Sequence, residues 1–291
     1  MAFIKIETKK YEPMMAAVTK IQSCTSILAK ETPNSGESAD AKFGIANTPT
    51  TKSAATPMTS IMRNRFKGSQ ILNRMIKPVN VKPSTSMPNW SALFSGTAPE
   101  NQNVYPFPSI FTLAKNSEEE SKSVIFHEWE ELQSIFPAEM IETRIICSDI
   151  ESALLIADYI AEEKPFFTAV VMNEPDSIGH KKRWGSAAYY ARLAELDSLI
   201  GIMVQATKNA GIYDSTVFVL SSDHGGVFWG HGFNSSRQRR IPLIIYGSGI
   251  KEGYAIPAKH SICDIAPTMA AILGLEIPSE WTGQPIQGIF R

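Results

Sequence analysis

Residues 166–180 read FFTAVVMNEPDSIGH, and residues 217–232 read VFVLSSDHGGVFWGHG. Each stretch opens with a short apolar run rich in β-branched and aromatic residues, which is typical of a buried strand. Within a few residues each run is followed by aspartate, histidine and glycine. In open α/β sheets, ligands collect at the carboxyl ends of strands. We therefore expect the polar clusters to lie where two buried strands end.

The rest of the chain alternates between short strands and helices. Further strands are expected at 124–126, 144–147 and 241–246, and helices at 148–162, 187–210 and 264–273. This alternation predicts an α/β fold with a mostly parallel central sheet and helices on both faces.

Several helix ends carry recognisable signals. The segment 83–96 reads as a loop that enters a helix, with Pro88 near the helix start and Gly96 just past its end. The sequence Ser148-Asp-Ile-Glu151 predicts a capping box at the start of the next long helix. Gly274 is the expected stop of the helix over 264–273.

Composition excludes few classes of protein. The 291 residues are 43% hydrophobic with a formal net charge of −1, which gives no signal for nucleic acid or an anionic membrane. Two short basic stretches, 181–183 and 237–240, are interpreted as solvated faces. The three cysteines lie far apart, which favours buried thiols in a reducing compartment over a disulfide framework. Without a signal peptide or an apolar run of membrane-spanning length, we expect a soluble protein, cytoplasmic by default.

The chain divides by composition into two parts. Residues 20–60 are rich in Ser, Thr, Pro, Ala and Asn, with few large apolar side chains to offset the entropy of ordering. We therefore expect residues 1–55 to form a disordered or atypical segment, and residues 56–291 to form one catalytic domain.

Three of the five histidines lie in the polar clusters, and this concentration predicts a metal site. Asp176, His180 and His231 would supply three ligands to one ion, and Asp223 with His224 would face a second. Two such ions about 4 Å apart would clamp an oxyanion and stabilise the attacking and leaving oxygens together. The alternative for any single residue is a structural polar group at the start of a loop.

The order of the motifs carries a family resemblance. A serine-rich segment before Met87-Pro-Asn89 is followed by DSIGH, SDHGG, GHG and, at 264–278, DIAPTMAAILGLEIP. Over about residues 56–288 this order resembles the alkaline phosphatase superfamily, and within it the type I phosphodiesterase/nucleotide pyrophosphatase family.

The resemblance implies an alkaline-phosphatase-like fold, two divalent ions (zinc) and hydrolysis of a small-molecule phosphodiester or nucleotide pyrophosphate. It makes Ser86 the nucleophile and implies a phosphoseryl intermediate. Asn89 matches the motif asparagine, which would cap or brace the following helix. The metal residues it implies are the five named above.

A second interpretation of Ser86 stays open. A serine hydroxyl needs a base or a metal to become a good nucleophile, and a helix start adds free N–H groups for an incoming phosphate. The commoner use of serine at a helix start is as the N-cap. Ser84, Thr85 and Ser91 lie close enough to shift the register of the motif.

The chain also departs from the family pattern. The resemblance implies a first strand that ends in a metal-binding aspartate, but no such strand is evident, and Asp40 is a weak candidate for that ligand. A non-catalytic relative that binds metal or phosphate is therefore one alternative. A sulfatase on the same scaffold is another, although Ser86-Met-Pro-Asn-Trp90 lacks the arginine expected after the proline.

Overall fold

The computed structural model describes residues 1–7, 79–98, 108–117, 122–135 and 141–291. Its main sheet has six strands in the order β4-β3-β5-β1-β6-β8. Their bounds are β1 Ala2–Glu7, β3 Ser123–His127, β4 Glu142–Ile145, β5 Phe167–Val171, β6 Thr216–Ser221 and β8 Leu243–Gly247. A second, two-stranded sheet pairs β2 (Val79–Asn80) with β7 (Arg240–Ile241).

Four of the six strands run in one direction. β3 pairs in parallel with both β4 and β5, and β5 and β6 both pair antiparallel with β1, so β5 and β6 share a direction. β1 and β8 run the opposite way. The predicted fold class, a mostly parallel sheet between helices, is confirmed.

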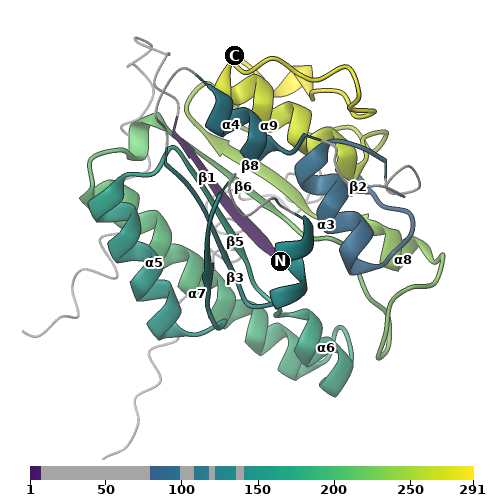
Figure 1. The fold of residues 1–291 in the computed structure, drawn as a ribbon. Coiled ribbons are helices and arrows are strands. Elements are labelled where there is room, and N and C mark those ends of the chain that lie inside the picture. Colours follow the sequence, from purple (N-terminus) through teal and green to yellow (C-terminus); the bar gives the residue numbers. More distant parts are fainter. Residues whose placement is uncertain (8–78, 99–107, 118–121, 136–140) are drawn as a thin grey trace, which may run out of the picture.

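Helices cover both faces of this sheet (Figure 1). α5 (Ile150–Glu163) and α7 (Ala187–Asn209) pack on one face over a core that includes Phe126 and Tyr159, whose rings meet edge to face at 5.5 Å. α3 (Ser86–Ser95), α4 (Ile110–Asn116) and α9 (Ile265–Leu273) pack on the other face. Burial of both sheet faces explains why β5 and β6 are rich in apolar and β-branched residues.

Shorter elements complete the described fold. The helical ones are η2 Glu130–Ile135, α6 Asp176–Lys182, η3 Tyr213–Ser215, α8 Ser236–Arg239, η4 Ile262–Asp264 and η5 Gln287–Ile289. None of the helices among the described residues has the length and apolar character needed to cross a bilayer.

Two of the expected helix ends are confirmed and one is corrected. Gly96 and Gly274 follow α3 and α9 with φ of 63° and 69°, a left-handed conformation that favours glycine. α5 is capped by Asp149, whose carboxylate accepts from the Ser152 amide at 2.8 Å. The prediction of a capping box with Ser148 as the N-cap is therefore wrong, because the N-cap is the next residue, Asp149. The Ser148 hydroxyl donates to Glu128 instead.

The N-terminal residues differ from expectation. Residues 2–7 belong to the stretch 1–55, for which the composition predicts a disordered or atypical segment, but they form β1 between β5 and β6 in the sheet (Figure 1). Ala2, Ile4 and Ile6 are fully buried, and the buried Lys5 extends its amine to the Pro165 carbonyl. A six-residue strand with a lysine at its centre gives only a weak periodic signal.

Other expectations concern the cysteines and the remainder of the N-terminal segment. Cys263 is buried, but Cys147 is exposed, which corrects the expectation that the thiols are buried. Cys24 and Asp40 lie outside the described residues, as does the expected domain boundary at 55/56.

Candidate metal centre

Three predicted ligands meet at the carboxyl edge of the sheet. β5 ends at Val171, and α6 begins four residues after Met172 with Asp176 and presents His180 one turn later. His231 comes from the loop that follows β6. Asp176, His180 and His231 each offer a ligand atom within 4.8 Å of the others. Residues distant in sequence thus form one candidate cation site.

Each histidine of this region is held by its Nδ1 atom. His180 Nδ1 lies 2.8 Å from the Trp229 carbonyl oxygen, His224 Nδ1 lies 3.0 Å from that of Gly225, and His231 Nδ1 lies 3.1 Å from that of Ser84. Because a carbonyl oxygen only accepts, each Nδ1 carries a proton, and a ring in its neutral form has its lone pair on Nε2. Backbone partners of this kind are how proteins orient metal-binding histidines.

These Nε2 atoms face carboxylate oxygens. Asp176 Oδ2 lies 3.4 Å from His180 Nε2, and Asp176 Oδ1 lies 3.6 Å from His231 Nε2. Asp176 Oδ1 is also buried with no hydrogen-bond donor among the described residues. Lone pairs that converge at these distances repel unless a proton or a cation lies between them. The donor set therefore fits a divalent cation with nitrogen and carboxylate ligands.

Asp223 and His224 form a second group beside the first. Asp223 Oδ2 lies 3.1 Å from His224 Nε2, and the His224 ring stacks on the His231 ring with centroids 3.7 Å apart. Burial lowers the pKa of His224, which keeps its ring neutral at pH 7 even though the neighbouring Asp223 opposes the shift.

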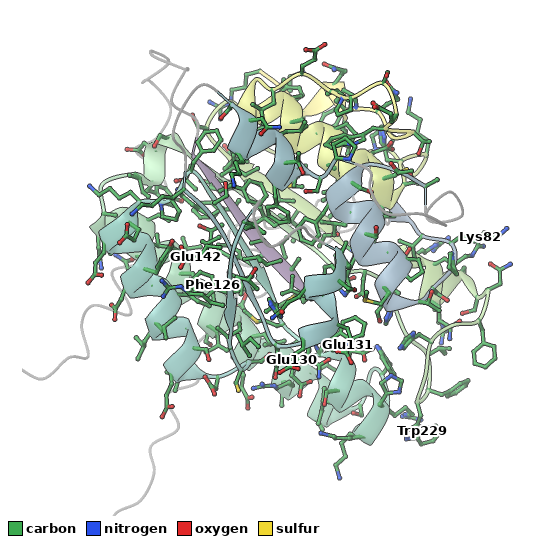
Figure 2. The ribbon with its side chains drawn as sticks, in the orientation of Figure 1. Lys82, Phe126, Glu130, Glu131, Glu142 and Trp229 are labelled. Carbon is green, nitrogen blue, oxygen red and sulfur yellow. The ribbon has the colours of Figure 1, made fainter. Side chains whose placement is uncertain are left out.

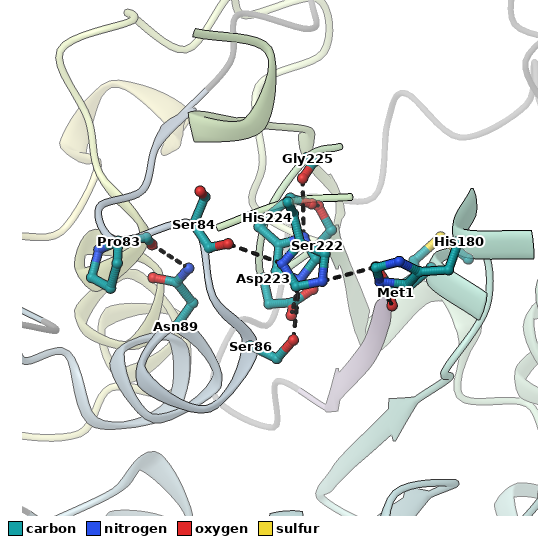
Figure 3. A network of polar contacts seen from close by, with 12 residues as sticks. Met1, Pro83, Ser84, Ser86, Asn89, His180, Ser222, Asp223, His224 and Gly225 are labelled. Atoms are coloured by element: carbon teal, nitrogen blue, oxygen red, sulfur yellow. Dashed lines mark hydrogen bonds and ion pairs between the residues drawn. The ribbon is translucent and has the colours of Figure 1, made fainter. Parts of the chain in front are cut away.

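The Ser86 hydroxyl contacts this second group, as Figure 3 shows. Ser86 Oγ lies 3.0 Å from His224 Nε2. In a serine hydrolase triad the carboxylate would bind the opposite ring nitrogen, but here Asp223 and Ser86 both approach Nε2 while Nδ1 faces a carbonyl. The arrangement therefore matches a hydroxyl beside a cation site better than a triad.

Neighbouring hydroxyls take other roles. The N-cap position of α3 is Thr85, which makes no side-chain cap bond, and Ser86 is the first helical residue. Ser84 is buried and donates to the Phe233 carbonyl at 2.7 Å. Asn89 is buried and donates from Nδ2 to the Pro83 carbonyl at 2.7 Å, so it ties the first turn of α3 to the preceding loop (Figure 3).

Trp184 joins the two ligand-bearing segments. A Cβ atom built on Gly179 would lie 2.6 Å from the Trp184 ring, and one on Gly226 would lie 2.1 Å from it. The same ring meets His180 edge to face at 4.9 Å. Glycine at both positions lets the indole pack between the α6 segment and the Asp223 loop. Trp229, by contrast, is 61% exposed and stands at the edge of the molecule (Figure 2).

A cavity of about 640 Å³ opens beside the candidate metal centre, and its lining includes Asp176, Asp223 and His224. Arg183, Arg237 and Arg240 are exposed, as expected for solvated faces, and the same three residues line this cavity. The sequence did not indicate that the two stretches border one cavity, because charge runs far apart in sequence give no sign of being brought together.

The resemblance implied a further metal-binding aspartate at the end of a first strand, beside Asp223 and His224. β1 fills the central position of the sheet, but it runs antiparallel to β5 and β6. Its first residues, with Met1, therefore lie at the ligand edge, and its last residue lies at the far edge. The last residue of β1, Glu7, is therefore remote from Asp223 and His224 and does not supply the aspartate that the resemblance implied at the end of a first strand.

Parts of the chain are similar in sequence to known proteins. A family model described as type I phosphodiesterase / nucleotide pyrophosphatase matches residues 109–229. Arylsulfatase K from Bos taurus is 32% identical over 102 residues, and that from Xenopus laevis is 36% identical over the same length. Each of these matches covers 33% of this chain, and the chain spans about a fifth of the length of these curated relatives.

Solved structures extend the likeness over most of the chain. Murine ectonucleotide pyrophosphatase/phosphodiesterase 5, an inactive variant in complex with AMP, has a TM-score of 0.59 at 11% identity, covering 76% of this chain and 93% of its own. A 2-O GAG sulfatase has a TM-score of 0.58 at 14% identity, covering 75% and 67%. These structures show an alkaline-phosphatase-like fold. The resemblance to the type I phosphodiesterase/nucleotide pyrophosphatase family is confirmed by the family model, over residues 109–229.

Proposed function

We propose that the chain is a metal-dependent hydrolase of phosphoric esters, of the phosphodiester or nucleotide pyrophosphate type, with Ser86 as its nucleophile. The observation that carries the proposal is the Ser86 hydroxyl, 3.0 Å from His224 Nε2 and beside a convergent set of aspartate and histidine ligands. The family model matched over residues 109–229 supports the phosphoric ester class.

The ligands for two zinc ions come from the predicted residues. Asp176, His180 and His231 would hold one ion, and Asp223 with His224 would hold the other. Such cations lower the pKa of a nearby hydroxyl and neutralise charge on the group being transferred.

The chain's own groups supply nucleophile and orientation. Ser86 Oγ would attack phosphorus in line with the leaving oxygen, so that one O–P bond forms as another breaks and the leaving alcohol takes up a proton. Water then cleaves the phosphoseryl ester and restores the hydroxyl. The amides in the first turn of α3 would bind the phosphoryl oxygens, because the first N–H groups of a helix lack partners within it.

Asn89 would act as a positioning residue. Its amide holds the Pro83 carbonyl, which fixes the loop that leads into Ser86. It lies on the side of that loop away from His224 (Figure 3), so a direct contact with substrate is not part of the proposal.

A sulfate ester is the second candidate substrate. Curated relatives that match the chain include arylsulfatase K, and one of the similar solved structures is a GAG sulfatase. The departure lies after Ser86, where Pro88 is followed by Asn89 and Trp90 and not by the expected arginine. A phosphodiester or nucleotide pyrophosphate therefore remains the first candidate.

Three chromogenic substrates decide between these proposals. The purified chain, freed of metal and reloaded with Zn²⁺, is assayed on bis-p-nitrophenyl phosphate, p-nitrophenyl phosphate and p-nitrophenyl sulfate. Turnover of a phosphate substrate that requires both metal and Ser86 supports the first proposal, and preferential turnover of the sulfate supports the second. Tight metal binding without turnover of any of the three would identify a non-catalytic relative.

A further inference from the structure

The cavity beside the candidate metal centre carries three arginines from two parts of the chain. Arg183 follows α6, which presents two of the ligands, whereas Arg237 and Arg240 belong to α8 and β7. Within the described part of the chain, none of their guanidinium groups forms an ion pair with a carboxylate. The carboxylates that share the cavity are Asp176 and Asp223, which the proposed function commits to cations.

The backbone fixes Arg237 and Arg240 close to the ligand loop. The Gly225 amide donates to the Gln238 carbonyl at 2.8 Å. A Cβ atom on Gly225 would lie 2.3 Å from the Arg237 carbonyl oxygen and 3.0 Å from that of Arg240. Only glycine permits this approach, and the loop that carries His224 is therefore in contact with the segment that carries these two arginines.

Arg183 is held in an unusual backbone conformation. Its φ is 76°, in the region that favours glycine, and its amide donates to the Gly179 carbonyl at 2.8 Å. The next residue, Trp184, bonds through its amide to the Phe228 carbonyl at 2.8 Å. A non-glycine residue in such a conformation is more frequent at functional sites than elsewhere.

We infer that the substrate carries a second anionic group besides the ester that is hydrolysed, and that Arg183, Arg237 and Arg240 bind it. The inference rests on the proposed function, because it needs the ester group to lie at the metal centre. Guanidinium groups form paired hydrogen bonds with phosphate, sulfate and carboxylate oxygens, and three of them in one cavity recognise an anion more strongly than a neutral group.

A phosphorylated nucleotide and a sulfated sugar share this chemistry, so the test uses a pair of probes for each. AMP is compared with ADP, and glucosamine 6-sulfate with glucosamine 2-N,6-O-disulfate, by calorimetric titration into the Zn²⁺-loaded chain. In at least one pair we expect the ligand with more anionic groups to bind about tenfold tighter. The pair that shows the preference identifies the source of the second anion.

The double variant Arg237→Gln/Arg240→Gln should remove most of the preference for the ligand with more anionic groups. Its affinity for the other member of the pair, AMP or glucosamine 6-sulfate, should change less than about threefold. Lys181→Gln/Lys182→Gln is the matched control, because it removes two positive charges from α6 outside the cavity. The control should keep the preference, and thermal melting of both variants checks that they fold.

Two results would overturn the inference. Equal affinities within both pairs in the unchanged protein would show that no second anion is recognised. An equal loss of preference in the arginine and lysine variants would show only a general effect of charge. Both results leave the proposed function standing if metal and the singly substituted ligands still bind, whereas failure to bind metal would contradict both proposals.

Discussion

Ser86 Oγ lies 3.0 Å from His224 Nε2, although 138 positions separate the two residues in sequence. The His224 ring is fixed from its other side by the Gly225 carbonyl, and its Nε2 also faces Asp223 at 3.1 Å. The contact places a helix-start hydroxyl at the edge of a cation site, and several consequences can be measured.

Replacing Ser86 by alanine should separate chemistry from metal binding. Ser86→Ala is expected to keep the metal content of the unchanged chain and to lower turnover of the preferred ester by about a thousandfold or more, because no other side chain takes the place of the nucleophile. Metal analysis and steady-state assays measure the two quantities. Ser91→Ala, a hydroxyl on the same helix away from His224, is the control and should remain active. A fully active Ser86→Ala variant would end the nucleophile assignment.

Replacing a proposed metal ligand should remove bound metal as well as activity, whereas Ser86→Ala should remove activity alone. His180→Ala takes away one of three ligands that converge within 4.8 Å, and we expect loss of bound zinc together with activity. Zinc affinity is measured by competition with a chromophoric chelator. His260→Ala serves as the control, because His260 pairs with Asp264 at 3.0 Å near α9 and has no place at the centre. If His180→Ala binds zinc as tightly as the control, His180 is not a ligand.

A substitution at Gly226 tests whether Trp184 joins α6 to the loop that carries Asp223 and His224. A Cβ atom there would lie 2.1 Å from the Trp184 ring, so Gly226→Ala should displace the indole, destabilise the fold by about 1–3 kcal/mol and weaken metal binding about tenfold. Gly230→Ala is the matched control, since a Cβ atom at Gly230 meets nothing within 4 Å. Denaturant unfolding and metal titration compare the two variants, and equal behaviour would show that Trp184 does not join the segments.

Asp197 of α7 provides a pH-dependent prediction remote from the centre. Burial raises the pKa of Asp197 to about 7, so the folded state holds this proton more tightly than the unfolded state. The resulting stabilisation is present below the unfolded pKa and is lost as the pH rises through about 7. Asp197→Asn should therefore stabilise the chain more at pH 8 than at pH 5, on the order of 1 kcal/mol because the group keeps some solvent contact.

Chemical denaturation at the two pH values measures this difference. Asp158→Asn, an exposed position on α5, is the control and should show little change between them. A stabilisation by Asp197→Asn that is larger at pH 5 would contradict the sign of the prediction.

Much of the fold was predictable, because strands that are buried on both faces of the sheet consist mostly of apolar residues. β5 and β6 appear in the sequence as runs of mostly apolar and β-branched residues, and the motifs after them carry the ligand types of the centre. The end of α3 was also predictable, because only glycine fits the left-handed residue at Gly96. In these cases a local physical requirement limits the choice of residue.

The remaining features depend on tertiary pairing. Side-chain alternation does not encode strand direction, and Ala2–Glu7 gave no sign that it enters the sheet antiparallel to β5 and β6. The position of Arg183, Arg237 and Arg240 around one cavity likewise depends on how α6 and the Gly225 loop pack together. Such contacts join segments whose separate sequences look like ordinary charged surface.

The central claim is that Asp176, His180 and His231 share one divalent ion. Anomalous diffraction at the zinc edge from crystals of the Zn²⁺-loaded chain tests it most directly. We predict a peak about 2.0–2.2 Å from an Asp176 carboxylate oxygen and from the Nε2 atoms of both histidines. Absence of a peak there, in crystals whose zinc lies elsewhere or is not bound at all, would contradict the account.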